Sequence, residues 1–268
     1  MESSSVLARN NVKISGSGAR PMMFAHGFGC DQSMWRYIWP AFGEQFRTVL
    51  FDHVGAGRSD LSAYDAQKYS TLHAYADDIV AIGRELEFND AVFVGHSVSA
   101  MMGVLASVKA PGMFGALILV GPSARYIDDG DYRGGFSRKD IDELLDSLAD
   151  NHMGWSAAMA PVIMGNPDRP ELGEELTNSF CRTDPAIAKA FARVTFMSDN
   201  RDDLSKVTAR TLILQCSDDI IAAENVGQYV HQNIPGSNYK LLEATGHCPN
   251  LSAPHEVIAA MNDFLDAR

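Results

Sequence analysis

The 268-residue sequence lacks the patterns that mark membrane, secreted and nucleic-acid-binding proteins. No apolar run approaches the ~20 residues of a membrane-spanning helix, and the polar start MESSSVLARNN lacks the apolar stretch of a signal peptide. Basic residues are scarce, since 22 Lys and Arg stand against 34 Asp and Glu. That balance argues against binding to nucleic acid or to an anionic membrane, which both need clustered Lys and Arg. We therefore expect a cytoplasmic protein with neither kind of partner.

Metal and cofactor motifs are also missing from the sequence. The four cysteines, Cys30, Cys181, Cys216 and Cys248, show no paired spacing, and the histidines form no H-E-x-x-H motif. The glycines in the loop 52–59 complete neither a G-x-G-x-x-G motif nor a phosphate-binding loop. These absences predict reduced thiols, no metal and no cofactor.

Short apolar runs recur along the chain and are typical of strands buried on both faces of a parallel sheet. The seven runs are NVKIS, PMMFAH, TVLFDH, AVFVGH, ALILVG, TLILQC and YKLLEA. Segments with helical spacing of apolar residues follow several of them, over 32–42, 72–86, 98–108 and 255–265. This alternation predicts the α/β class, with a doubly wound, mostly parallel sheet flanked by helices.

The alternation stops after ALILVG and resumes at TLILQC. Residues 122–201 show mostly helical patterns, punctuated by Gly, Pro and Asp. We call these residues the cap segment and predict that it is a helical insertion between two strands of a core formed by 1–121 and 202–268. Its apolar side chains must pack into a small core of their own, and some are expected to line a pocket over the sheet. The residues assigned to that pocket are Phe136, Trp155, Met159 and Phe196.

The stretch VFVGHSVSA, residues 92–100, resembles the G-x-S-x-G motif that exposes a serine on a sharp turn between a strand and a helix. Ser97 follows an apolar strand and precedes a helical pattern, which is the context that this motif requires. A serine hydroxyl becomes a nucleophile when a base and an orienting acid lie beside it. The last position of the motif holds Ser99 in place of glycine. We interpret Ser99 as a tolerated change, with its hydroxyl bonded locally to the backbone and its helix slightly repacked.

The acid and the base are expected after later strands, in the chain order Ser, Asp, His. The loop after TLILQC holds Asp218 and Asp219. We favour Asp219 as the acid, while Asp218 caps or braces the turn. His247 follows the last strand in the turn 245–247 and is the expected base.

Acyl transfer also needs N–H donors for the oxyanion that develops on the substrate. One expected donor is the N–H of Val98, directly after the nucleophile, and the other lies in the loop HGFG, residues 26–29. We expect the Phe28 N–H to donate there and the Phe28 ring to form a wall of the pocket. His26 and His96 are expected to brace these loops.

Together these motifs resemble the α/β-hydrolase superfamily, and within it the RsbQ-like group of bacterial stress-signalling hydrolases. The wider group includes the plant strigolactone and karrikin receptors. The resemblance implies four cap helices over a small hydrophobic pocket, to which we also assign Cys248, and a triad of Ser97, His247 and Asp219. The motifs that carry it are HGFG, DHVGAGRS at 52–59, VGHSV at 94–98, FCRTDP at 180–185 and GHCP at 246–249.

The resulting expectation is a serine hydrolase that cleaves a small hydrophobic carboxylic ester or lactone through an acyl-enzyme. The alternative, which rests on the resemblance, is a signalling hydrolase or receptor. It would bind such a ligand and act with a regulatory protein partner, a phosphatase of a stress pathway. Both functions use the same pocket, so the sequence leaves the choice between them open.

Overall fold

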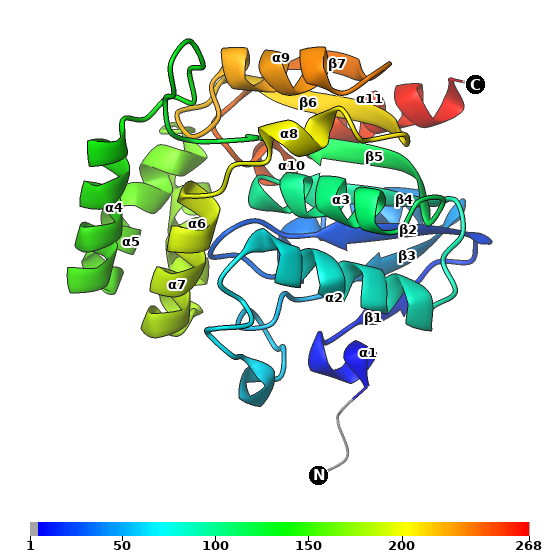
Figure 1. Ribbon diagram of the computed structural model, residues 1–268, viewed down its shortest axis with the longest axis horizontal. Helices are drawn as coiled ribbons and strands as arrows, with labels where there is room; N and C mark the ends of the chain where they lie inside the picture. The colour runs from blue at the N-terminus through cyan, green and yellow to red at the C-terminus, as the bar shows by residue number, and fades with distance from the viewer. Residues whose placement is uncertain (1–4, 268) are drawn as a thin grey trace.

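Seven strands form a single sheet in the order β1-β3-β2-β4-β5-β6-β7 (Figure 1). The computed structural model describes residues 5–267. β1 pairs antiparallel with β3, and the other neighbouring strands pair in parallel. This arrangement confirms the predicted α/β class and the mostly parallel sheet. The strands are β1 (Lys13–Ser15), β2 (Arg20–Ala25), β3 (Phe46–Leu50), β4 (Ala91–His96), β5 (Phe114–Val120), β6 (Arg210–Asp218) and β7 (Asn238–Thr245).

Helices cover both faces of the sheet, because alternate side chains of the central strands point to opposite faces. On one face, Met23 and Phe93 belong to a hydrophobic cluster with residues of α2, α3 and α9. On the other face, Phe24 and Val94 belong to a cluster with residues of α11. The helices are α1 (Val6–Arg9), α2 (Leu72–Glu85), α3 (Val98–Lys109), α4 (Arg138–Asp150), α5 (His152–Met164), α6 (Pro170–Arg182), α7 (Pro185–Phe196), α8 (Arg201–Leu204), α9 (Glu224–Asn233), α10 (Pro249–Ser252) and α11 (Pro254–Asp266).

The predicted helix over 32–42 is wrong. This segment forms two short 3-10 helices, Gln32–Trp35 and Trp39–Phe42. Pro40 has no N–H group and disfavours the α conformation in the residue before it, so a continuous α-helix cannot pass this point. The apolar spacing still serves the core, since Ile38 is fully buried.

The expectation of burial on both faces fails for both edge strands. β1 pairs with β3 alone, and Ile14 in it is 48% exposed. β7 lies at the other edge and pairs with β6 alone. Leu241 in β7 is consequently 41% exposed, although it belongs to an apolar run.

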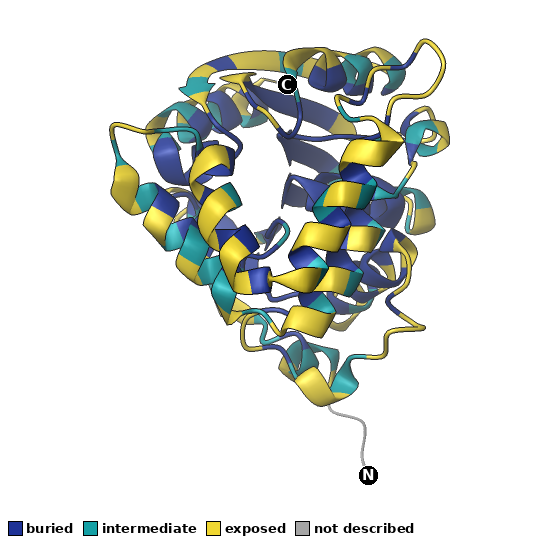
Figure 2. Ribbon diagram, turned by 90° about the vertical axis from the view of Figure 1, so that its left-hand side faces the viewer, coloured by how far each residue is buried: buried dark blue, intermediate teal, exposed yellow. Residues whose placement is uncertain are grey.

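The four helices α4–α7 lie between β5 and β6 in the chain and gather beyond one end of the sheet (Figure 1). α5 packs along α6, and α4 packs against α5 and α7. Their outward residues are exposed and their inward residues are buried (Figure 2). The inward side chains, among them Trp155 and Phe180, belong to the same hydrophobic cluster as one face of the sheet. The expected separate small core is therefore wrong, because these side chains extend the core of the sheet.

The predicted boundary between residues 201 and 202 falls within α8, which packs against α3 and α9. Residues 1–4 and 268, which the predicted core includes, lie outside the described residues. The division into core and cap segment stays a prediction. Over residues 5–267, no helix is long and apolar enough to cross a membrane.

Candidate active site

Ser97 lies on a sharp turn between β4 and α3. Its backbone has φ 56° and ψ −125°, a conformation that non-glycine residues seldom adopt. The Ser97 N–H donates to the Val120 carbonyl at 2.8 Å, which fixes the turn against β5. Gly95 permits the turn, because a Cβ atom there would lie 2.6 Å from the Ser99 carbonyl oxygen. The strained turn directs the Ser97 side chain toward the space beneath the cap segment.

A chain of hydrogen bonds joins Ser97, His247 and Asp219. The Ser97 hydroxyl lies 2.7 Å from His247 Nε2, and His247 Nδ1 lies 2.7 Å from Asp219 Oδ2. The carboxylate accepts from Nδ1–H, so Nε2 is free to accept the hydroxyl proton. The three side chains are buried and come from the ends of β4, β6 and β7. The carboxyl ends of these parallel strands thus bring together residues that are distant in sequence.

Asp219 is held as a carboxylate by its partners. Its Oδ1 atom accepts from the N–H groups of Ile221 at 2.8 Å and Ala222 at 3.1 Å. Burial acts to raise the pKa of the Asp219 carboxyl, but the nearby His247 ring and these hydrogen bonds outweigh burial and lower the pKa below its ordinary value. The side chain of Asp218 is exposed, and its carbonyl accepts from the Gly246 N–H at 2.6 Å. The structure therefore brings Asp219, and not the carboxylate of Asp218, to His247.

The His247 loop is bonded to the cap segment as well as to the core. The His247 N–H donates to the Ile163 carbonyl at 2.9 Å, at the end of α5, and Asn166 Nδ2 donates to the Thr245 carbonyl at 3.2 Å. From the core side, His96 Nε2–H donates to the His247 carbonyl at 2.7 Å. Burial, with a contribution from the His247 ring, lowers the pKa of His96 to about 3, so His96 is neutral. His96 braces this loop and is not itself in contact with a carboxylate.

One expected oxyanion donor belongs to Val98, directly after Ser97, and the other to Phe28, in a loop that lies against the Ser97 side chain. Val98 is the first residue of α3, and the N–H groups of the first helical turn have no partner within their helix. In the described part of the chain, the Phe28 N–H donates to no backbone or side-chain acceptor. Both N–H groups are thus available to an oxygen atom bound next to Ser97. Their role as oxyanion donors stays a prediction.

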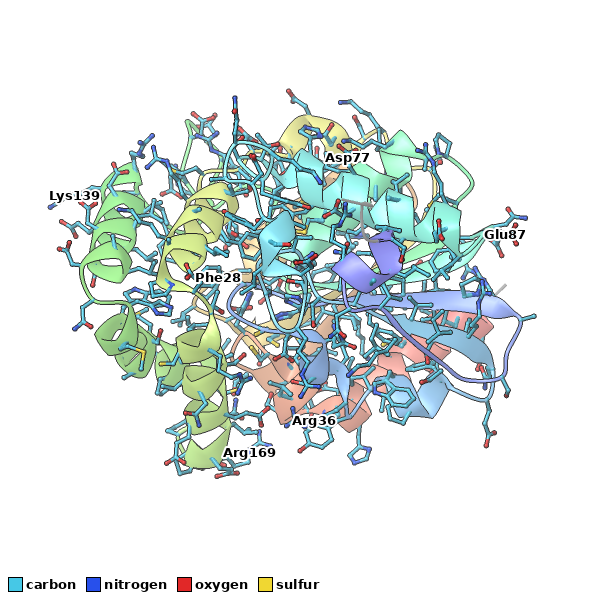
Figure 3. All side chains as sticks on the ribbon, turned by 90° about the horizontal axis from the view of Figure 1, so that it is seen from below. Phe28, Arg36, Asp77, Glu87, Lys139 and Arg169 are labelled. Atoms are coloured by element: carbon cyan, nitrogen blue, oxygen red, sulfur yellow. The ribbon has the colours of Figure 1, made fainter. Side chains whose placement is uncertain are left out.

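A cavity of about 30 Å³ lies beside Ser97, between the sheet and the cap segment. Its walls are mostly apolar, and no Lys, Arg, Asp or Glu side chain lines it. Phe28 lies between the cap helices and the core (Figure 3) and contacts the rings of Trp155, Phe180 and Phe196. The lining residues are Phe28, Cys30, His96, Ser97, Tyr126, Trp155, Ile163, Leu176, Phe180, Thr195, Phe196, Ile221, His247 and Cys248.

Four of the six residues assigned to the pocket from sequence line this cavity, namely Phe28, Trp155, Phe196 and Cys248. Phe136 and Met159 do not line it. Both are partly buried and pack against the hydrophobic cluster that joins the cap segment to the sheet. Their apolar side chains indicate that they face inward. Apolar character alone does not tell whether such a residue lines the cavity or packs elsewhere in the cluster.

The family follows from the sequence as a whole. The sequence model of the alpha/beta hydrolase family matches residues 22–260. The chain belongs to the alpha/beta hydrolase family. This hydrolase is 37% identical over 253 residues to the karrikin insensitive 2 receptor CA of Petunia hybrida, with 94% of each chain covered. It is 36% identical over 258 residues to the strigolactone esterase D14 of Arabidopsis thaliana, with 96% of each chain covered.

A solved structure of a hydrolase from Oleispira antarctica has the same fold. Its TM-score is 0.95 at 38% identity, with 98% of this chain and 97% of that chain covered. The predicted superfamily and the relation to the plant receptors are confirmed. Relatives named as esterases and relatives named as receptors thus occur in one group. The stress pathway and its phosphatase stay predictions.

Sequence reasoning missed two hydroxyl groups in the pocket of this hydrolase. Tyr126 and Thr195 both line the cavity, and both are about 1% exposed. Within residues 5–267, neither the Tyr126 hydroxyl nor Thr195 Oγ1 has a hydrogen-bond partner. Burial raises the pKa of Tyr126, so its hydroxyl is protonated and can donate. No sequence signal identifies them, because Tyr126 lies in an irregular stretch and Thr195 is one polar residue on an apolar helix face.

The thiols in the pocket offer no competing nucleophile. Cys30 and Cys248 are buried, and burial raises the pKa of Cys30 to about 12 and that of Cys248 well above its ordinary value. Both therefore remain protonated at neutral pH. Over the described residues, no group of three or more His, Cys, Asp or Glu side chains could hold a metal ion.

Proposed function

We propose that this protein is a serine hydrolase that cleaves a small hydrophobic carboxylic ester or lactone through an acyl-enzyme. The observation that carries the proposal is the hydrogen-bonded series Ser97, His247 and Asp219 at an apolar pocket. The proposal also assigns residues 122–201 as a cap over the core and Asp219, rather than Asp218, as the acid.

The proposed reaction has two halves. In the first, Ser97 Oγ bonds to the carbonyl carbon while His247 Nε2 takes the hydroxyl proton, and Asp219 stabilises the imidazolium. The Phe28 and Val98 N–H groups hold the oxyanion. His247 then returns its proton to the leaving alkoxide, and the ester bond breaks. In the second half, water attacks the acyl-enzyme while His247 takes its proton, and His247 returns this proton to Ser97 Oγ as the acid leaves.

The pocket supports a substrate that is small and mostly apolar. The proposed lining residues Phe28, Trp155, Phe196 and Cys248 offer no charge to a carboxylate or ammonium group. A space of about 30 Å³ holds one or two water molecules, so even a small ester must displace side chains of the cap segment to enter. The unpartnered hydroxyls of Tyr126 and Thr195 favour a substrate with an oxygen acceptor in addition to the scissile carbonyl.

The direct test is turnover of p-nitrophenyl butyrate by the Ser97→Ala variant. We expect turnover to fall to the background rate, and we expect phenylmethylsulfonyl fluoride to sulfonylate the wild-type protein at Ser97 only, with loss of HF. Undiminished turnover by the variant would refute the proposal.

The second candidate function is that of a receptor whose ligand controls binding to a regulatory protein. It is favoured by the resemblance to a receptor named for karrikin and by two exposed apolar side chains on α5, Met153 at 59% and Val162 at 52%. If this function holds, a purified phosphatase of the same organism's stress pathway binds only in the presence of ligand. Met153→Asp abolishes that binding and leaves ester turnover unchanged. Ligand-independent binding, or none, contradicts it.

A further inference from the structure

Ser99 stands where the motif usually has glycine, and its side chain contacts residues that are distant in the sequence. Its side chain is fully buried in the first turn of α3. The hydroxyl oxygen lies 2.5 Å from the His26 carbonyl oxygen and 2.7 Å from His53 Nε2. The sequence-based expectation of a local bond to the backbone is therefore wrong. The hydroxyl instead joins α3 to the loops that follow β2 and β3.

The distances assign the protons in this group. A carbonyl oxygen only accepts, so the Ser99 hydroxyl donates to His26 and must accept from His53 Nε2–H. The other ring nitrogen of His53 then carries a lone pair and no proton. This agrees with its surroundings, because Nδ1 is buried without a partner in the described chain and the ring packs between those of Phe51, Tyr75 and Phe191. An unpartnered N–H would be costly at that place.

The bonds continue from His53 to the loop that carries Phe28. The backbone N–H of His53 donates to His26 Nε2 at 3.1 Å, so the proton of the neutral His26 ring is on Nδ1. That Nδ1–H donates to the Gly27 carbonyl at 2.9 Å. The Gly27 carbonyl and the Phe28 N–H belong to one planar peptide group and point in opposite directions. Fixing the carbonyl therefore fixes the direction of the Phe28 N–H.

We propose that Ser99 is a positioning residue of the hydrolytic reaction, which holds the two oxyanion donors, Val98 N–H and Phe28 N–H, in a fixed relation. Ser99 follows Val98 in the same helical turn, and its hydroxyl holds the His26 carbonyl, which begins the Phe28 loop. Glycine at this position would leave α3 without that bond. This inference rests on the proposed hydrolase function.

The expected effect of Ser99→Ala is a loss of about tenfold in kcat with KM within about twofold. Removal of an oxyanion donor itself costs ~10²–10³-fold. The loss here is smaller, because the donor is only less well oriented and His53 Nε2, 3.2 Å from the His26 carbonyl, keeps a weaker bond to it. The substrate's ground-state contacts are with other residues, so KM changes little.

The test compares Ser99→Ala with Ser107→Ala. Ser107 is buried in the same helix, and its hydroxyl donates only within that helix, to the Val104 carbonyl at 2.8 Å. Each variant is assayed with p-nitrophenyl butyrate and with a trifluoromethyl ketone, whose carbonyl carbon bonds to Ser97 Oγ to give an oxyanion. We expect Ser99→Ala to weaken inhibition by the ketone by the same factor as kcat, and Ser107→Ala to change neither. If both quantities in Ser99→Ala lie within twofold of wild type, or if Ser107→Ala loses as much, the inference is wrong.

A spectroscopic measurement separates this inference from the proposed function. A long-range ¹H–¹⁵N spectrum of the histidine rings reports the tautomer of each ring without reference to activity. We expect His53 to be protonated at Nε2 and His26 at Nδ1. A His26 ring protonated at Nε2 would break the link to Gly27 and overturn the inference. Turnover that survives Ser97→Ala would instead overturn the proposed function and leave these tautomers unchanged.

Discussion

The two sides of Ser97 are held in place by different kinds of interaction. On the base side, the ionised Asp219 holds His247, and the loop that carries this histidine is bonded to the cap segment. On the oxyanion side, Ser99 and the neutral histidines hold the start of the loop 26–29 from the core, and Ser179 of α6 donates to the Gly29 carbonyl at 2.9 Å. A movement of the cap segment would therefore reach both sides of Ser97.

The contrast has an electrostatic reason. A buried charge is tolerated where a partner and several hydrogen bonds stabilise it, and Asp219 has both. Burial lowers the pKa of His26 and that of His53, so the two rings that hold the Phe28 loop are neutral. In the proposed reaction, the charge on Asp219 stabilises the imidazolium of His247, whereas neutral donors suffice to orient a peptide group.

The largest expected effect comes from removing the charge on the base side. Asp219→Asn leaves the shape of the site intact but can hold the wrong tautomer of His247, and kcat should fall by about 10⁴-fold. The control is Asp218→Asn, whose side chain is exposed and should leave kcat within about twofold. Steady-state kinetics with p-nitrophenyl butyrate measure both. Equal losses in the two variants would mean that the acid is wrongly assigned.

The neutral histidines predict a dependence of stability on pH. His26, His53 and His96 have folded-state pKa values below the unfolded value of about 6.5, so the unfolded chain binds more protons below that pH. The contribution of these three histidines to the free energy of unfolding is therefore complete above pH 6.5 and decreases as the pH drops below that value. Each histidine contributes a slope of up to about 1.4 kcal/mol per pH unit, down to its folded-state pKa.

Urea unfolding of wild type and of His53→Phe between pH 7.5 and 4.5 measures this slope. Phenylalanine suits the aromatic surroundings of the ring, and the variant should lose one histidine's share of the slope. His73→Phe, at an exposed position, is the control and should retain the full slope. An unchanged slope in His53→Phe would show that His53 is not held neutral.

The bond between the cap segment and the base should have a moderate effect. Asn166 donates to the Met164 carbonyl at 2.8 Å and to the Thr245 carbonyl at 3.2 Å. Asn166→Ala should lower kcat about three- to tenfold, as expected for the loss of the one hydrogen bond from this side chain to the His247 loop. The matched control is Asn225→Ala, which removes a similar bond to the Arg133 carbonyl at 2.9 Å, far from this loop. A similar drop in kcat for both would argue for a general loss of stability.

The smallest effect is expected from Tyr126→Phe. Because the buried hydroxyl has no partner within residues 5–267, its removal should leave stability unchanged or raise it by up to about 1 kcal/mol. Turnover of p-nitrophenyl butyrate should change less than twofold, and that of an ester with a second carbonyl should fall several-fold. Thermal unfolding and kcat/KM with both esters provide the comparison. Equal losses for the two esters would contradict a role in recognising a second acceptor.

Much of the fold was predictable from local pattern. The inner strands β2–β6 appear as apolar runs because strands buried between two helical layers need apolar side chains on both faces. The failures have different causes. Pro40, a local cause, interrupts a helical pattern that is otherwise regular. The exposure of β7 is not local, because the order of strands in the whole sheet places this strand at an edge.

The sequence by itself determined the elbow at Ser97 and candidates for its acid and base, since chain order and strand ends restrict where these residues can stand. Only the tertiary structure decided what their neighbours do. Ser99 looked like a local variation, but packing brings its hydroxyl to His26 and His53, on loops far away in the chain. A hydrogen bond forms only within a narrow range of donor–acceptor distances. The distance between two segments far apart in the chain is set by the packing of the whole fold, so it cannot be read from the residue types at single positions.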